Sequence, residues 1–164
     1  MVGEMCWCAY DSPLGRMVAV SRGGCLAGLY FDDQRDLPAL AASAEMPANG
    51  LLGEVGEQLT DYFGGRRRRF ELPLLAAPTA FQQRVREALL QVGAGDTCSY
   101  AALAAAIGQP RAARAVARAL AANPLVVVVP CHRVVTSAGG LGGFSAGLPR
   151  KRALLALEGG GAVQ

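Results

Sequence analysis

The sequence contains only one histidine, His132, and its five cysteines are Cys6, Cys8, Cys25, Cys98 and Cys131. An odd number of cysteines at this low density does not fit a disulfide scaffold, so we expect free thiols and a reducing, cytoplasmic compartment. The single residue between Cys6 and Cys8 is fewer than the roughly two to four that zinc-ligand pairs enclose. With no second histidine available, we expect no metal site and no cofactor.

The sequence also lacks a secretory leader pattern and any long uninterrupted hydrophobic run. Its longest apolar stretches are broken by glycine, proline or arginine, whereas a membrane-spanning helix needs about 20 apolar residues. Since 52% of the residues are hydrophobic, the chain has enough apolar surface for a real core. We therefore expect a soluble globular protein without a membrane partner.

Charge is distributed unevenly along the chain. Residues 1–78 carry seven arginines and ten acidic residues, a net charge of −3, whereas residues 79–164 carry nine basic and three acidic residues, a net charge of +6. The basic half favours a polyanionic partner. The run Arg66 to Arg69 lies in the acidic half and is either a solvated loop or a phosphate contact.

The first half is expected to be an α/β unit. Short strands are predicted at residues 6–10, 17–20 and 25–31, separated by turn-forming Ser-Pro-Leu-Gly and Arg-Gly-Gly sequences, which indicates an antiparallel meander. An amphipathic helix is predicted over residues 51–63 and ends at Gly64-Gly65. One more strand is expected at residues 69–72. The segment between Pro73 and Pro78 is typical of a linker.

The second half is expected to be mostly helical. Thr79 and Gln82 form a capping-box pattern for a helix that runs to about Val92. Ser99 is placed to cap a helix over residues 100–107, and Pro110 opens another over residues 111–122. Two short helices joined by a tight turn form a helix-turn-helix.

Three arginines follow one stripe of the second of these helices: Arg111, Arg114 and Arg118. Small neighbours such as Ala112 and Ala113 allow a close approach, which suits a nucleic-acid backbone. The alternative is an ordinary solvated basic face.

Pro130-Cys131-His132-Arg133 follows the four-valine run at residues 126–129, which is expected to be a strand. A free thiol has a pKa of about 8.5, so a cysteine nucleophile needs a neighbouring base or positive charge. His132 can be that base and Arg133 can add positive field, provided that the backbone turns at Pro130, because adjacent residues of a strand face opposite sides. The alternative is that Cys131 is a small buried core residue.

A glycine-rich loop, with Gly139, Gly140, Gly142 and Gly143, precedes Phe144 and Ser145. It can approach a ligand closely, or it can be a plain hairpin connection. Pro149 begins a last helix, in which Glu158 is available to orient His132.

Six motifs occur in order in the second half. They are Phe81-Gln82-Gln83-Arg84-Val85, Ser99-Tyr100, Ala112-Ala113-Arg114-Ala115-Val116, Asn123-Pro124, Pro130-Cys131-His132-Arg133-Val134-Val135, and Lys151-Arg152-Ala153-Leu154-Leu155 with Glu158. In these motifs the chain resembles the O6-alkylguanine-DNA alkyltransferases. Weaker similarities in the first half are Asp11-Ser12-Pro13-Leu14-Gly15 and Tyr62-Phe63.

The resemblance implies a fold and two domains. Residues 1–75 would form a ribonuclease H-like α/β domain, and residues 76–164 a mostly helical, winged helix-turn-helix-like domain that carries the active-site cysteine. It also implies a monomer that repairs O6-alkylguanine, and O4-alkylthymine, in double-stranded DNA by one irreversible alkyl transfer, without a cofactor. Cooperative binding to DNA stays open.

The resemblance also implies a role for each site residue. Cys131 would be the alkyl acceptor, His132 would take its proton through a water, Glu158 would orient His132, and Asn123 would brace the turn. Tyr100 would donate a proton to the leaving purine. Further residues would lie near the guanine: Val134, Phe144, Ser145 and Lys151. Arg114 would enter the duplex from the minor groove in place of a flipped nucleotide.

The chain departs from the family pattern at two places. Phe144 stands where many relatives have tyrosine, and Ala117-Arg118 replace glycines that some members carry in the recognition helix. These differences are expected to tune the substrate range.

Three alternatives are weighed against this interpretation. A cysteine hydrolase would use the same Cys-His-acid set but would not explain the helix-turn-helix. A lesion-binding protein of the alkyltransferase-like type has tryptophan in place of Cys131. A transcription regulator with an inert thiol would bind a specific sequence in the major groove.

Overall fold

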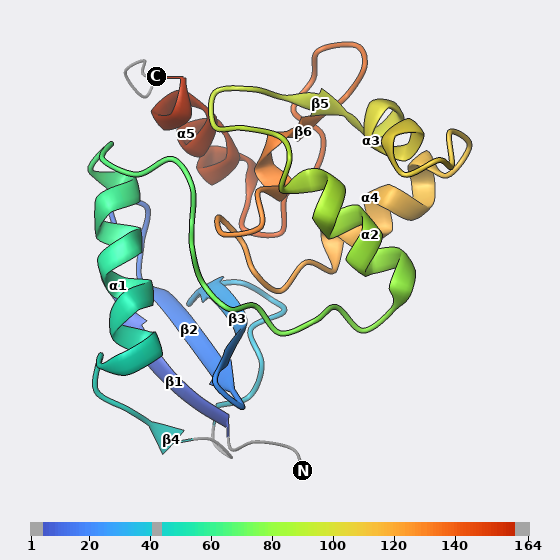
Figure 1. The fold of residues 1–164 in the computed structure, drawn as a ribbon. Helices are drawn as coiled ribbons and strands as arrows, with labels where there is room; N and C mark the ends of the chain where they lie inside the picture. Colours follow the sequence, from blue (N-terminus) through green and yellow to red (C-terminus); the bar gives the residue numbers. More distant parts are fainter. Residues whose placement is uncertain (1–4, 41–43, 160–164) are drawn as a thin grey trace. The chain divides into compact units, whose positions relative to one another are not determined.

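The computed structural model describes residues 5–40 and 44–159 of the chain (Figure 1). The chain divides into two compact units, Met1–Leu75 and Ala76–Gln164. Among the described residues, no helix is both long and apolar enough to cross a membrane.

The first unit is built on a four-stranded sheet in the order β3-β2-β1-β4. The strands β1 (Met5–Tyr10), β2 (Met17–Arg22) and β3 (Cys25–Phe31) form the expected antiparallel meander. The short strand β4 (Ala44–Glu45) adds to β1 in parallel and was not predicted.

The helix α1 (Gly50–Phe63) packs on this sheet and buries the predicted face, including Leu52, Val55 and Leu59. It ends where expected. The Gly65 amide donates to the Tyr62 carbonyl and the Arg66 amide to the Asp61 carbonyl, the paired bonds of a Schellman motif. Gly65 has a φ of +76°, which favours glycine at this position.

The strand expected at residues 69–72 is absent, and that prediction was wrong. The side chain of Gln58 bonds both the amide and the carbonyl of Glu71, at 2.9 and 3.0 Å, and so takes the groups that a strand partner would use. Beyond Glu71, this segment contacts the sheet at Leu74, which forms a single parallel bridge with Leu26.

The second unit is mostly helical, as expected. It contains α2 (Ala80–Leu89), α3 (Tyr100–Ala106), α4 (Ala113–Ala121) and α5 (Leu148–Glu158), with a 3-10 turn, η1 (Cys131–Arg133). The short strands β5 (Cys98–Ser99) and β6 (Val134–Val135) pair in parallel. The predicted N-caps are confirmed, because Thr79 accepts from the Gln82 amide and Ser99 from the Ala102 amide.

Two helix boundaries differ from the prediction. The helix α2 ends at Leu89 rather than near Val92. The helix α4 begins at Ala113, and Arg111 lies in the preceding turn, closed by the Ala112 amide on the Gln109 carbonyl. The residues through Ala112 form the turn that reverses the chain between α3 and α4. Of the three predicted stripe arginines, only Arg114 and Arg118 therefore lie on the helix itself.

The four valines at residues 126–129 do not form a strand, and that prediction was also wrong. They are buried in consecutive turns, in which the Val128 amide donates to the Val126 carbonyl and the Val129 amide to the Leu125 carbonyl. Val127 has a φ of +73°, which is unusual for a β-branched residue. Such a residue costs about 1–3 kcal/mol and persists only where its surroundings hold it.

Candidate active site

The predicted turn at Pro130 is present and delivers Cys131. Cys131 is the first residue of η1, and Pro130, with φ −81° and ψ 60°, leads into it. Because the three residues of η1 form a tight turn, Cys131, His132 and Arg133 do not alternate as they would on a strand. Cys131 is buried, with 6% of the residue exposed.

Asn123 holds this turn from the end of α4. Its side-chain amide nitrogen donates to the Val129 carbonyl and to Sγ of Cys131, both at 3.2 Å, while its oxygen accepts the Leu125 amide at 3.0 Å. One side chain therefore ties both ends of the valine turn and also contacts the sulfur. An N–H donor aimed at sulfur stabilises the thiolate over the thiol.

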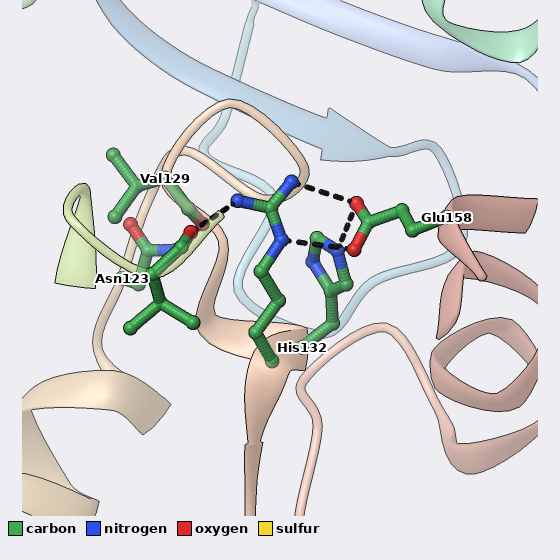
Figure 2. A network of polar contacts seen from close by, with 6 residues as sticks. Asn123, Val129, His132 and Glu158 are labelled. Atoms are coloured by element: carbon green, nitrogen blue, oxygen red, sulfur yellow. Dashed lines mark hydrogen bonds and ion pairs between the residues drawn. The ribbon is translucent and has the colours of Figure 1, made fainter. Parts of the chain in front are cut away.

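His132 and Glu158 point toward each other in Figure 2, with Nε2 of His132 2.7 Å from Oε2 of Glu158. Because a carboxylate only accepts, neutral His132 carries its proton on Nε2. Its Nδ1 then has a free lone pair. This atom is buried and has no hydrogen-bond partner among the described residues.

The environment of His132 lowers its pKa. Complete burial is the main cause, and the positive charges of Arg133 and Lys151 act in the same direction. The hydrogen bond and charge of Glu158 oppose the shift. Since the pKa lies below its usual value, His132 is neutral at pH 7 and its Nδ1 can accept a proton.

Arg133 does not point its charge at the thiol as the sequence suggested. Its guanidinium bonds both oxygens of Glu158, through Nε at 2.8 Å and Nη2 at 2.9 Å, and its Nη1 donates to the Val92 carbonyl at 2.7 Å. Sequence reasoning missed this pairing. No spacing pattern links residues 133 and 158, which meet only because α5 packs against η1.

A cavity of about 360 Å³ opens beside Cys131. This is within the range of small-ligand pockets, about 300–1,000 Å³. Its walls come from α3, α4 and the glycine-rich loop, and its lining residues are Tyr100, Ala117, Leu120, Ala121, Cys131, Gly143, Phe144 and Ser145. Three of the residues expected near a substrate, Tyr100, Phe144 and Ser145, thus share one cavity with the sulfur.

Lys151 anchors the loop that forms one wall of this cavity. Its amine is fully buried and donates to the Val134 carbonyl at 2.6 Å and to the Gly143 carbonyl at 3.0 Å. The Gly143 amide in turn donates to the hydroxyl of Tyr100 at 3.3 Å. Val134, also expected near the substrate, is completely buried in β6 and is not among the residues that line this cavity; its carbonyl accepts the Lys151 amine.

The arginines expected at DNA lie on and just before α4. Arg114 and Arg118 are exposed one turn apart on the helix, and Arg111 is exposed in the turn before it. Ala112 and Ala113 are half-buried at the start of the helix. Ala117, between the two helical arginines, lines the cavity of Cys131. The same helix therefore connects the basic face to the site.

Within residues 5–40 and 44–159, no group of three or more histidine, cysteine or acidic side chains could hold a metal ion. The described cysteines, including Cys6 and Cys8 of β1, are all free thiols.

A helix-turn-helix with exposed arginines beside a cavity that contains a cysteine is typical of a DNA-binding protein that uses a thiol for chemistry on DNA. Two family models match the chain. Residues 5–76 match the ribonuclease-like domain of 6-O-methylguanine DNA methyltransferase, and residues 80–160 match its DNA binding domain. The chain belongs to the 6-O-methylguanine DNA methyltransferase family. The expected fold, a ribonuclease-like domain followed by a DNA-binding domain, is confirmed.

Individual relatives agree with the family models. The methylated-DNA–protein-cysteine methyltransferase of Mycobacterium leprae is 42% identical over 90% of this chain and 88% of its own length. The constitutive enzyme of Bacillus subtilis is 35% identical over 88% and 89%. A crystal structure of Mycobacterium tuberculosis OGT in complex with DNA superposes with a TM-score of 0.87 and 38% identity, covering 94% of this chain and 93% of that one.

Proposed function

We propose that Cys131 is the residue that receives the alkyl group. The chain is a methylated-DNA–protein-cysteine methyltransferase, which repairs O6-methylguanine in DNA directly. The observation that carries the assignment is that Cys131 lines a cavity while its sulfur accepts a hydrogen bond from Asn123 and adjoins a buried His-Glu pair. Cys98, the other described cysteine of this unit, has its pKa raised by burial, which disfavours its thiolate.

The reaction is a displacement at the alkyl carbon. His132 takes the thiol proton on Nδ1 through a bridging water, which gives that buried nitrogen a partner. The sulfur bonds to the alkyl carbon as the carbon–oxygen bond to O6 breaks, and the electron pair stays with the guanine. Tyr100 donates a proton to the leaving purine. Because its hydroxyl oxygen accepts the Gly143 amide, its own hydrogen is available to the substrate.

The product explains why no cofactor is needed. A thioether is stable and offers no leaving group for water, so each molecule acts once and irreversibly. The same displacement applies to O4-alkylthymine, whose oxygen leaves in the same way. Phe144 and Ser145 hold the base, with Ser145 as a hydrogen-bond donor near the guanine oxygen.

Repair of a base inside a duplex requires that the base leave the stack. Arg114 enters the minor groove and fills the gap, while Arg111 and Arg118 contact phosphates and the small Ala112 and Ala113 permit close approach. The exposure of all three arginines supports this arrangement. The protein acts as a monomer in the reducing cytoplasm, where its free thiols persist.

Intact-protein mass spectrometry tests the assignment directly. We expect a mass increase of one methyl group per chain after mixing with O6-methylguanine DNA, located at Cys131 by peptide mapping. Cys98→Ser should react as the unaltered protein does, and Cys131→Ser should not react. Alkylation of Cys98 or Cys25 with Cys131 unmodified would contradict the proposal.

A further inference from the structure

We propose that Arg133 is a positioning residue that keeps His132 in the neutral, proton-accepting form by holding Glu158 through both carboxylate oxygens. This inference rests on the proposed role of His132 as the base. Its basis is the two-pronged contact at 2.8 and 2.9 Å between side chains that are 8% and 2% exposed. Paired, planar contacts of this kind are the strongest that a carboxylate makes.

Charge balance in the buried cluster explains how this contact acts. With His132 neutral, Arg133 and Glu158 carry opposite charges that cancel. Without Arg133, Glu158 would lose the positive charge held against both of its oxygens, and a buried charge that loses such a partner is destabilised. Uptake of a proton by His132 would restore neutrality. A protonated imidazole cannot accept the proton of Cys131, so the loss of Arg133 would disable the base while leaving it in place.

The other charged groups around His132 remain unchanged when Arg133 is replaced. Glu158 and Lys151 reach His132 from α5, and Cys131 precedes it in η1. Lys151 is fixed by the Val134 and Gly143 carbonyls, and Phe144, whose ring lies 6.3 Å from the imidazole, is uncharged. Arg133 is therefore a positive group held against both oxygens of Glu158.

Geometry as well as charge distinguishes Arg133 from a lysine. Its three nitrogens reach three acceptors, two on Glu158 and one on the Val92 carbonyl. A lysine has one nitrogen and cannot reproduce this fork. Arg133→Lys should therefore keep part of the effect and Arg133→Gln none of it.

The single histidine makes the test direct, because every imidazole signal in a ¹⁵N NMR spectrum comes from His132. We expect the unaltered protein to show the neutral tautomer with the proton on Nε2. In Arg133→Gln the titration midpoint should rise by about one pH unit or more, roughly a tenfold gain in proton affinity, with a smaller rise in Arg133→Lys. Arg152→Gln, an exposed arginine of α5, removes the same charge and should leave the midpoint unchanged.

Two further comparisons separate this role from a structural one. The rate of transfer from free O6-benzylguanine should fall at pH 7 in Arg133→Gln and recover at higher pH. In a Glu158→Gln background, Arg133→Lys should no longer move the midpoint. The inference would be overturned if the His132 titration midpoint in Arg133→Lys equalled that in Arg152→Gln. It would also be overturned if Arg133→Lys shifted this midpoint equally with Glu158 present and in the Glu158→Gln background. If Arg133→Gln does not fold, Arg133→Lys carries the test. The NMR titration reads His132 whether or not alkyl transfer occurs, so failure of the proposed function would be seen separately.

Discussion

Replacement of Asn123 by alanine should lower both the free energy of unfolding and the rate of alkyl transfer. Each of these two losses can be estimated from the hydrogen bonds that Asn123 makes. The Leu125 amide lies on a completely buried residue and would lose its Asn123 partner. An unsatisfied buried amide costs about 1–3 kcal/mol. The Val129 carbonyl keeps the Cys131 amide at 2.7 Å, so its loss is smaller, about 0.5–1.5 kcal/mol.

The free energy of unfolding should therefore fall by about 2–4 kcal/mol, a large share of the roughly 5–15 kcal/mol of a typical domain. The hydrogen bond to Sγ of Cys131 adds an effect on rate. A hydrogen bond to a charged group contributes about 1.5–3 kcal/mol, so transfer should slow roughly 10- to 150-fold.

Urea unfolding measures the first quantity, and transfer from free O6-benzylguanine, under conditions in which the variant is fully folded, measures the second. Gln91→Ala, which removes an exposed amide of the same unit, serves as the control. A loss below about 1 kcal/mol with an unchanged rate would refute the view that Asn123 holds the turn and the sulfur.

Three further outcomes are expected. Glu158→Gln should slow alkyl transfer while the DNA affinity stays within a small factor of that of the unaltered protein. An unchanged pH profile of the transfer rate would show that Glu158 takes no part in activating His132. Arg114→Ala should strongly slow repair of duplex DNA but barely change the rate of transfer from free O6-benzylguanine. Arg118→Ala should mainly weaken DNA binding and lower the salt dependence of the affinity. Equal rate losses on duplex DNA and on the free base in Arg114→Ala would contradict the base-flipping role of Arg114. Because burial lowers the pKa of His132 below its unfolded value of about 6.5, the unfolded state takes up more protons below that pH, so the free energy of unfolding should fall as the pH drops through this range. The same pH titration of urea unfolding with His132→Gln should show a shallower fall, and an identical slope would exclude this contribution.

The parts of the fold that the sequence predicted are those set by local patterns. Alternating strands with turn residues between them, Ser99 and Thr79 as caps, and Gly64-Gly65 after α1 each act within a few residues. Their physical signal is present in the sequence itself. The same holds for the turn at Pro130, because a cysteine and a histidine can cooperate there only if the chain bends.

The errors occur where a side chain outside the segment bonds its backbone and overrides the local preference. Four valines favour a strand, but Asn123 bonds the backbone at both ends of this segment and holds it in turns. Gln58 does the same to Glu71. The pairing of Arg133 with Glu158 has no local signal at all, since it depends on the packing of α5 against η1.

The pairing of β5 with β6 closes a loop in the chain, because Ser99 lies beside Val135 and Cys98 beside Val134. Both helices of the helix-turn-helix, Asn123 and Cys131 all lie between these two strands in sequence. Segments closed in this way tend to open as one cooperative element. We therefore expect recognition and chemistry to share a single opening equilibrium, so that a fluctuation that exposes the thiol also unfolds the helices proposed to bind DNA.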